Sequence, residues 1–174
     1  MASLSKILTK RKEIIQDGID RGFRDRSITE EDCRYLYELL AISKPRVVIE
    51  IGTWTGVSAM FLAECGAKVY TCDKAKAYSQ KHSGIKYYNC WSTEFLKKIK
   101  NKGVMADLVL LDGRLLDCDK KRLLRVVKDK ACIITHDYVP GSKGARNFDL
   151  LKRELTDIRK YDEIGVATLN KRKK

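Results

Sequence analysis

The chain has 174 residues, enough for one hydrophobic core, and 44% of them are hydrophobic. Lysine and arginine (36) outnumber aspartate and glutamate (23), and the net charge of +13 would attract nucleic acid or another polyanion without identifying one. No apolar run is long enough to cross a bilayer, no signal peptide is evident, and the six cysteines form no Cys-x-x-Cys pair. These features argue against a disulfide-framed secreted protein and a membrane partner, and they favour a cytoplasmic location.

The N-terminal part of the chain shows the apolar spacing of two helices. The first is expected from Leu4 to Ile19. Thr29 followed by Asp32 is typical of a helix N-cap, and this second helix is expected to run through Leu40, before Pro45 stops the pattern. These two helices are one available lid, and the loop from Val139 to Gly144 is the other.

From Val47 onward, short apolar runs rich in β-branched residues alternate with helical patterns. Strands that are apolar throughout are buried on both faces, which is typical of a parallel sheet covered by helices. Strands are expected at Val47–Ile51, Val69–Cys72, Ile85–Tyr88, Leu108–Leu111 and Cys132–Thr135. Helices are expected at Val57–Cys65, Ala75–Gln80, Thr93–Ile99, Lys120–Val127 and Arg146–Leu155.

The pattern changes near the C-terminus. Ile158–Tyr161 and Val166–Leu169 are expected to pair as a hairpin, so that one or two antiparallel strands end the sheet. We therefore predict a single α/β domain in which helices cover both faces of a mostly parallel, Rossmann-like sheet. It would consist of N-terminal helices in residues 1–44, a core in residues 45–170 and a basic tail in residues 171–174.

Five of the expected strands end in polar or glycine-bearing tips. An open α/β sheet binds its ligand outside the carboxyl ends of its strands, so these tips together outline a candidate cleft. The tips are Gly52–Gly56, Asp73, Asn89–Ser92, Asp112–Arg114 and His136–Tyr138.

The first tip holds Gly52 and Gly56, four residues apart and directly after an expected strand. Glycine at such a turn lets bare backbone N–H groups approach a ligand. The middle glycine of the Gly-x-Gly-x-x-Gly pattern is missing, which argues against a dinucleotide such as NAD. Together with Glu50, the stretch resembles instead the first motif of class I S-adenosylmethionine-dependent methyltransferases, which reads acid, one residue, glycine, three residues, glycine.

This resemblance extends from Val47 through Tyr138 and implies the methyltransferase fold with an S-adenosylmethionine site. In that family the glycine loop passes under the amino-acid end of the cofactor, and an acid after the second strand holds the ribose hydroxyls. Asp73 matches that acid, and its two oxygens could accept from both hydroxyls. Trp91, after the third strand, could cover the adenine. The implied cofactor-binding residues are Glu50, Gly52, Thr53, Trp54, Gly56, Ser58, Asp73, Trp91, Ser92 and Asp112.

Within the class, the stretch from Gly56 to Ala59 looks closest to small O-methyltransferases of the catechol and sugar types. Ser58 would then donate to the cofactor carboxylate. These relatives often hold a divalent metal between an acid after the fourth strand and an acidic or amide pair after the fifth. Asp112 and Asp137 match those places, so the resemblance implies a site for Mg²⁺ or another divalent cation, which would lower the pKa of an acceptor hydroxyl.

The match is incomplete just after Asp112. The relatives carry Lys or His three positions later, where this chain has Leu115, with Arg114 beside it. Without a metal, His136 is the better candidate for the general base, because the unperturbed pKa of histidine lies near neutrality. The candidate catalytic residues are therefore His136, Asp112 and Asp137.

Three functions remain in view. We favour transfer of a methyl group to a hydroxyl of a small molecule or sugar, because of the first motif. The net charge favours an RNA ribose 2′-O-methyltransferase, in which Asp112 would be the aspartate of a Lys-Asp-Lys-Glu set that this sequence does not otherwise complete. The third is a non-catalytic cofactor-binding module with a basic surface.

Overall fold

The computed structural model describes residues 1–25 and 27–171, so most of the expected basic tail lies outside the described residues. The strands are β1 (Val47–Ile51), β2 (Lys68–Asp73), β3 (Ile85–Asn89), β4 (Ala106–Leu111), β5 (Val127–Thr135), β6 (Leu155–Tyr161) and β7 (Ile164–Leu169). The helices are α1 (Leu4–Asp20), α2 (Glu30–Ser43), α3 (Val57–Glu64), α4 (Ser92–Asn101), α5 (Lys120–Val126) and α6 (Lys143–Leu151), with 3₁₀ turns at Asp117–Asp119 and Lys152–Glu154.

The strands form one seven-stranded sheet in the order β3-β2-β1-β4-β5-β7-β6. Strands β1 to β5 run parallel to one another, and β7 pairs antiparallel with both β5 and β6. The hairpin between β6 and β7 closes through Asp162 and Glu163, and Asp162 takes the positive φ of 47° that a tight hairpin turn needs. The expected mostly parallel α/β sheet with an antiparallel C-terminal strand is confirmed.

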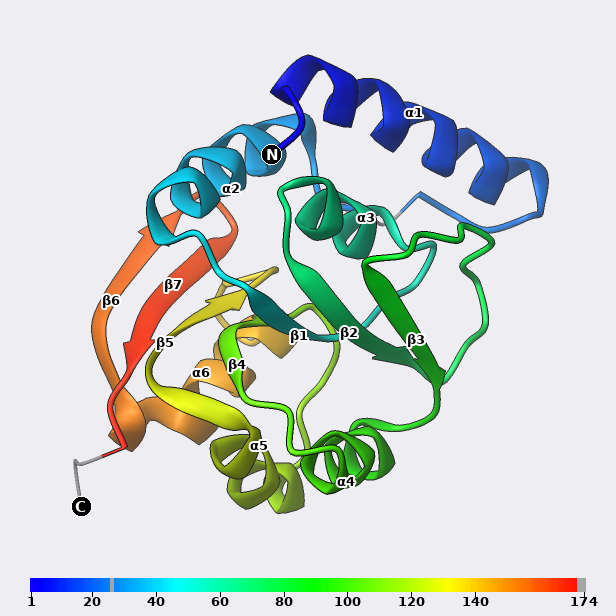
Figure 1. Ribbon diagram of the computed structural model, residues 1–174. Coiled ribbons are helices and arrows are strands. Elements are labelled where there is room, and N and C mark those ends of the chain that lie inside the picture. The colour runs from blue at the N-terminus through cyan, green and yellow to red at the C-terminus, as the bar shows by residue number, and fades with distance from the viewer. Residues whose placement is uncertain (26, 172–174) are drawn as a thin grey trace.

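Helices cover both faces of the sheet (Figure 1): α1, α2 and α3 lie on one face and α4, α5 and α6 on the other. Side chains alternate across each strand, so Val48 packs on the α1–α3 side while its neighbour Ile49 packs on the α4–α6 side. Both faces of the central strands are therefore buried, as their continuous apolar sequences predict. None of the helices in residues 1–25 and 27–171 is long and apolar enough to cross a membrane.

The start of α2 confirms the N-cap expected at Thr29. The Thr29 hydroxyl accepts from the Asp32 backbone N–H at 3.0 Å, and the Asp32 carboxylate accepts in return from the Thr29 N–H at 2.8 Å. This reciprocal pair satisfies two donors of the first turn. Lys44 ends the helix in the left-handed conformation, directly before Pro45.

The helix expected at Ala75–Gln80 is wrong, because this segment has no regular secondary structure. Three contacts hold it in place: the Asp73 carboxylate accepts from the Ala75 N–H at 2.9 Å, the Tyr78 ring stacks on Tyr87, and the Ser79 hydroxyl donates to Asp17 at 2.6 Å. The first of these is a local turn contact, and the two tertiary contacts of Tyr78 and Ser79 outweigh the weak helical preference of a short segment.

The bounds of α6 and α5 also differ from expectation. Helix α6 begins at Lys143 rather than Arg146, because the Ser142 hydroxyl caps it by accepting from the Ala145 N–H at 3.1 Å. It ends at Leu151, and Leu155 already belongs to β6. Strand β5 begins at Val127, the residue at which α5 was expected to end.

Candidate active site

A crevice of about 550 Å³ opens at the carboxyl ends of the strands on the β1–β2 side of the sheet. Four of the residues expected to bind the cofactor line it: Gly52, Asp73, Trp91 and Ser92. The other lining residues are Ile51, Cys72, Lys74, Cys90, Gly113, Arg114 and Leu116. The tips of β1, β2 and β4 and the loops that follow β2 and β3 therefore meet around one space.

The turn after β1 is fixed by the neighbouring strands. The backbone N–H groups of Gly52 and Thr53 both donate to the Cys72 carbonyl, at 2.9 and 3.2 Å, so they are engaged within the protein. Gly52 has a φ of +101°, and a Cβ atom built on it would lie 2.4 Å from the Gly113 nitrogen. The glycine is thus required by the close approach of the β1 and β4 tips, a reason that differs from the ligand contact expected from the sequence.

Asp73 ends β2 with its carboxylate facing the first loop. One oxygen accepts from the Trp54 N–H at 2.9 Å, and the other accepts from the Ala75 N–H at 2.9 Å. Each carboxylate oxygen can accept a second hydrogen bond, so the group is oriented and still has acceptor capacity. The side chain of Asn89 donates to the Asp73 carbonyl at 3.1 Å and holds the β3 tip against it.

Glu50 is fully buried beneath the same loop. The Thr71 hydroxyl donates to its Oε2, and Thr71 also bonds the Thr53 hydroxyl at 2.5 Å. Burial raises the pKa of Glu50 to about 7, against the lowering effect of the Ser58 and Thr71 hydroxyls. Its Oε1 has no hydrogen-bond partner, which leaves one buried acceptor available to a donor in the loop region.

The two residues expected after β3 play different parts. Trp91 is 59% exposed and lines the crevice, with the Lys74 ammonium 4.8 Å from its ring centroid. Ser92 is buried, and its hydroxyl donates to the Asp119 carboxylate at 2.6 Å. Trp91 thus offers an apolar face to a ligand, whereas Ser92 ties the start of α4 to the loop after β4.

The tips of β4 and β5 bring Asp112, His136 and Asp137 together. Their potential ligand atoms all lie within 4.8 Å of one another, so the three side chains form a group that could hold a metal ion. His136 Nδ1 lies 3.2 Å from Asp112 Oδ1 and 3.4 Å from Asp137 Oδ1. Asp137 has a φ of 56°, an unusual backbone conformation of the kind that gathers at functional sites.

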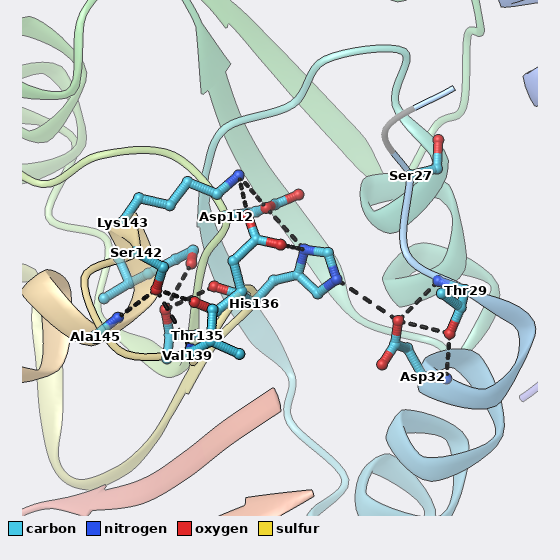
Figure 2. Close-up of polar contacts among 12 residues, drawn as sticks. Ser27, Thr29, Asp32, Asp112, Thr135, His136, Val139, Ser142, Lys143 and Ala145 are labelled. Carbon is cyan, nitrogen blue, oxygen red and sulfur yellow. Dashed lines mark hydrogen bonds and ion pairs between the residues drawn. The ribbon is translucent and has the colours of Figure 1, made fainter. Parts of the chain in front are cut away.

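Lys143, at the start of α6, also belongs to this cluster, although the sequence analysis did not single it out. Its ammonium group lies 2.9 Å from Asp112 Oδ1 and 3.0 Å from Asp137 Oδ2, and Figure 2 shows the side chain reaching toward Asp112. The sequence signal was the lysine in the loop Val139–Gly144, directly after the β5 tip, where the sequence indicated only a closing segment.

Asp32 approaches the cluster from α2. Its Oδ2 lies 3.6 Å from His136 Nε2, on the opposite side of the ring from Asp112 (Figure 2). The sequence identified Asp32 only as a capping residue, and nothing in a capping pattern indicates a second contact across the fold. The structure therefore joins α2 to the β5 tip through one buried carboxylate.

The charges of this cluster set its ionisation. Burial alone would lower the pKa of His136, but the carboxylates of Asp112, Asp32 and Asp137 outweigh it and raise the pKa to about 10. Burial likewise opposes ionisation of Asp112, yet His136 and Lys143 hold the pKa of Asp112 below its usual range. The raised pKa favours the imidazolium form of His136, a hydrogen-bond donor, near neutral pH, and the role of general base expected for His136 stays a prediction.

No protein-family profile matches the sequence, and no curated protein matches it at a significant level. Solved structures do resemble the fold. An O-methyltransferase from Bacillus cereus in complex with S-adenosylhomocysteine has a TM-score of 0.75 and 17% identity, with 93% of this chain and 91% of that chain covered. The O-methyltransferase TomG from Streptomyces achromogenes, in complex with S-adenosylmethionine, has a TM-score of 0.73 and 16% identity, with 92% and 89% covered.

A further structure, the methyltransferase MycE of the mycinamycin pathway with Mg and S-adenosylhomocysteine, has a TM-score of 0.57 and 14% identity, with 83% of this chain and 49% of that chain covered. At these identities the likeness concerns the fold. The fold expected from the first motif, that of the class I methyltransferases, is therefore confirmed.

Proposed function

We propose that the chain is an S-adenosylmethionine-dependent O-methyltransferase that acts on a hydroxyl of a small molecule or sugar. The observation that carries the proposal is the position of the crevice beside Gly52 and Asp73, directly next to the charged cluster around Asp112. A nucleoside-sized space and a set of proton-handling groups thus meet at one edge of the sheet. O-methyltransferases bound to this cofactor or its product share the fold.

The residues present fit the cofactor. Asp73 keeps acceptor capacity for the two ribose hydroxyls, and Trp91 offers a crevice-facing ring to the adenine. Glu50 keeps one unpartnered oxygen under the loop that would carry the amino-acid end. The remaining candidate residues, Gly52, Thr53, Trp54, Gly56, Ser58, Ser92 and Asp112, would shape that space. When bound, the cofactor supplies a methyl group already activated by its sulfonium.

The chain's own residues then have to align the acceptor and manage one proton. Methyl transfer forms the bond between acceptor oxygen and methyl carbon as the sulfur–carbon bond breaks, and the hydroxyl proton must leave. We assign hydrogen-bond acceptance from the hydroxyl to the ionised Asp112, while His136 and Lys143 hold that carboxylate in place. Alignment and exclusion of water supply most of the rate in such a transfer.

Three further points belong to this proposal. The free state of all six cysteines supports a reducing, cytoplasmic location. The net charge of +13 keeps RNA among the acceptors to be screened, since a polyanion would be attracted to such a surface. The N-terminal helices, with Asp32 reaching His136, are the segment we propose as the lid.

Calorimetric titration with S-adenosylhomocysteine tests the proposal. We expect micromolar binding, and Asp73→Ala should weaken it about thirtyfold, or about 2 kcal/mol, because charged hydrogen bonds to the ribose are lost. Asp149→Ala, at an exposed position of α6, serves as the control and should bind like the unchanged protein. A screen of hydroxylated small molecules, sugars and RNA with labelled cofactor then identifies the acceptor.

The outcomes separate cleanly. Absence of binding to the unchanged protein would remove the proposed function. Binding that Asp73→Ala leaves unaltered would retain the function and remove the role given to Asp73. Methyl transfer to RNA alone would replace the small-molecule acceptor by a nucleic acid.

A further inference from the structure

The ammonium group of Lys143 lies where a metal ion would bridge the two carboxylates of the cluster. It contacts Asp112 Oδ1 at 2.9 Å and Asp137 Oδ2 at 3.0 Å, both distances of charge-assisted hydrogen bonds. Asp112 Oδ1 also faces His136 Nδ1 at 3.2 Å. One oxygen of each carboxylate, Asp112 Oδ1 and Asp137 Oδ2, is therefore already engaged by the ammonium of Lys143.

The position of Lys143 is fixed by the backbone around it. Ser142, the N-cap of α6, accepts from the Ala145 N–H and donates its hydroxyl proton to the Asp137 carbonyl. A Cβ atom on Gly144 would lie 2.3 Å from the His136 carbonyl oxygen, so only glycine lets the first turn of α6 press this closely on β5. The first turn of α6 is thus locked to the residues whose charges its lysine neutralises.

The charge balance makes the two kinds of cation mutually exclusive. Asp112 and Asp137 supply two carboxylates, and the ammonium of Lys143 contacts both of them. A divalent cation between Asp112 and Asp137 would stand within a few ångströms of this ammonium, a strongly repulsive arrangement in a partly buried site. The lysine would have to leave before an ion could enter.

We propose that Lys143 is the resident cation of this active site and takes the place that an exchangeable divalent ion would fill. The inference rests on the proposed function and deepens it. The ammonium holds Asp112 and Asp137 in position and directs a remaining N–H at the acceptor oxygen. It stabilises the negative charge that develops on that oxygen as the hydroxyl proton passes to Asp112, and it keeps its own proton. That charge is then lost as the oxygen bonds to the methyl carbon and the sulfur–carbon bond breaks.

Titration with Mn²⁺, followed by the loss of the free-ion electron paramagnetic resonance signal, tests this directly. The unchanged protein should bind the ion weakly, and Lys143→Met should bind it at least about tenfold more tightly, because the carboxylates lose their internal counter-charge. Lys143→Arg, which keeps the charge, should behave like the unchanged protein. Lys98→Met removes a lysine that pairs with Glu94 at 2.7 Å on the exposed side of α4 and serves as the control.

Two results would overturn the proposal. One is equal affinity of the unchanged protein and Lys143→Met for Mn²⁺, whether both bind tightly or neither binds. The other is methyl transfer by the unchanged protein that stops in a chelator and returns with Mg²⁺. Lys143→Gln provides a second neutral variant if Lys143→Met fails to fold.

Binding of S-adenosylhomocysteine is measured on the same samples. If the cofactor product binds and the metal results fail, only the role of Lys143 is lost. If it does not bind to the unchanged protein, the failure belongs to the proposed function, and the metal titration still reports whether Lys143 excludes the ion.

Discussion

The two halves of the candidate site are built in opposite ways. The β1–β2 half is made largely by the backbone: consecutive residues from Gly52 to Gly56 form a turn held by the Cys72 carbonyl and closed by Asp73. The β4–β5 half is made by charged side chains that α2, the two strand tips and α6 each contribute. A local motif can describe the first half, whereas only the folded chain assembles the second.

The halves also treat buried acids differently. Glu50 has hydroxyl neighbours and no adjacent cation, so burial raises its pKa to about 7. Asp112 is similarly enclosed, yet His136 and Lys143 hold its pKa below the usual range. Burial alone therefore does not decide whether an acid ionises, because the neighbouring cations decide it.

The largest effect is expected from breaking the backbone half. Gly52→Ala should destabilise the protein by about 4 kcal/mol, because its Cβ would overlap the Gly113 backbone and its φ is left-handed. Gly66→Ala is the matched control: its φ is +95°, but a Cβ there would meet nothing within 4 Å, so only about 1 kcal/mol of backbone strain is expected. Urea denaturation measures the free energy of unfolding of both variants. Equal losses would show that the contact with Gly113 does not contribute to the effect of Gly52→Ala.

A smaller effect, dependent on pH, is expected at Glu50. Its folded-state pKa of about 7 exceeds the ordinary value of 4.5, so the folded protein retains a proton that the unfolded chain releases, and stability falls as the pH rises between these values. Glu50→Gln removes this loss. The free energy of unfolding of this variant, relative to that of the unchanged protein, should therefore rise by about 3 kcal/mol as the pH increases from 4.5 to 7 or above. Denaturation curves at several pH values supply the measurement.

Glu38→Gln provides the comparison for this experiment, since it removes an acid from an exposed position of α2. A difference between Glu50→Gln and the unchanged protein that stayed constant from acid to neutral pH would contradict the raised pKa of Glu50.

The charged half should respond in rate rather than in cofactor affinity. Asp112→Asn should lower the methyl-transfer rate about 100-fold, equivalent to about 2.7 kcal/mol in the barrier, because the amide no longer carries the charge that draws the hydroxyl proton. Its affinity for S-adenosylhomocysteine should stay within about twofold. Asp73→Asn should instead lower the affinity for S-adenosylhomocysteine and not the methyl-transfer rate. A loss of both rate and affinity in Asp112→Asn would contradict the separation of the two halves.

Much of the fold could be predicted from the sequence because its signals are local. The continuous apolar strands and Thr29 as N-cap each act within a few residues. The same holds for Asp73, whose place at the end of β2 follows from the strand itself. These features required no knowledge of distant contacts.

The rest depends on contacts between segments far apart in the chain. The segment Ala75–Gln80 stays irregular because Tyr78 stacks on Tyr87 and Ser79 bonds Asp17 in α1. Lys143 and Asp32 could not be assigned to the site from sequence for the same reason. Lys143 pairs with Asp112, which lies 31 residues earlier in the chain, and Asp32 in α2 pairs with His136 at the tip of β5. Asp112 and His136 could be identified from the sequence, but Lys143 and Asp32, whose charges act on them, could not.

The double role of Asp32 limits how this protein could acquire a new acceptor. Exchanging α2 for a foreign helix would remodel the cover over the site, but it would also withdraw the counter-charge on the far side of the His136 ring. Variation is better tolerated on the outward side of the helix, at exposed positions such as Arg34 and Glu38. Evolution or design of new selectivity therefore has to preserve the first turn of α2 while altering the rest of its surface.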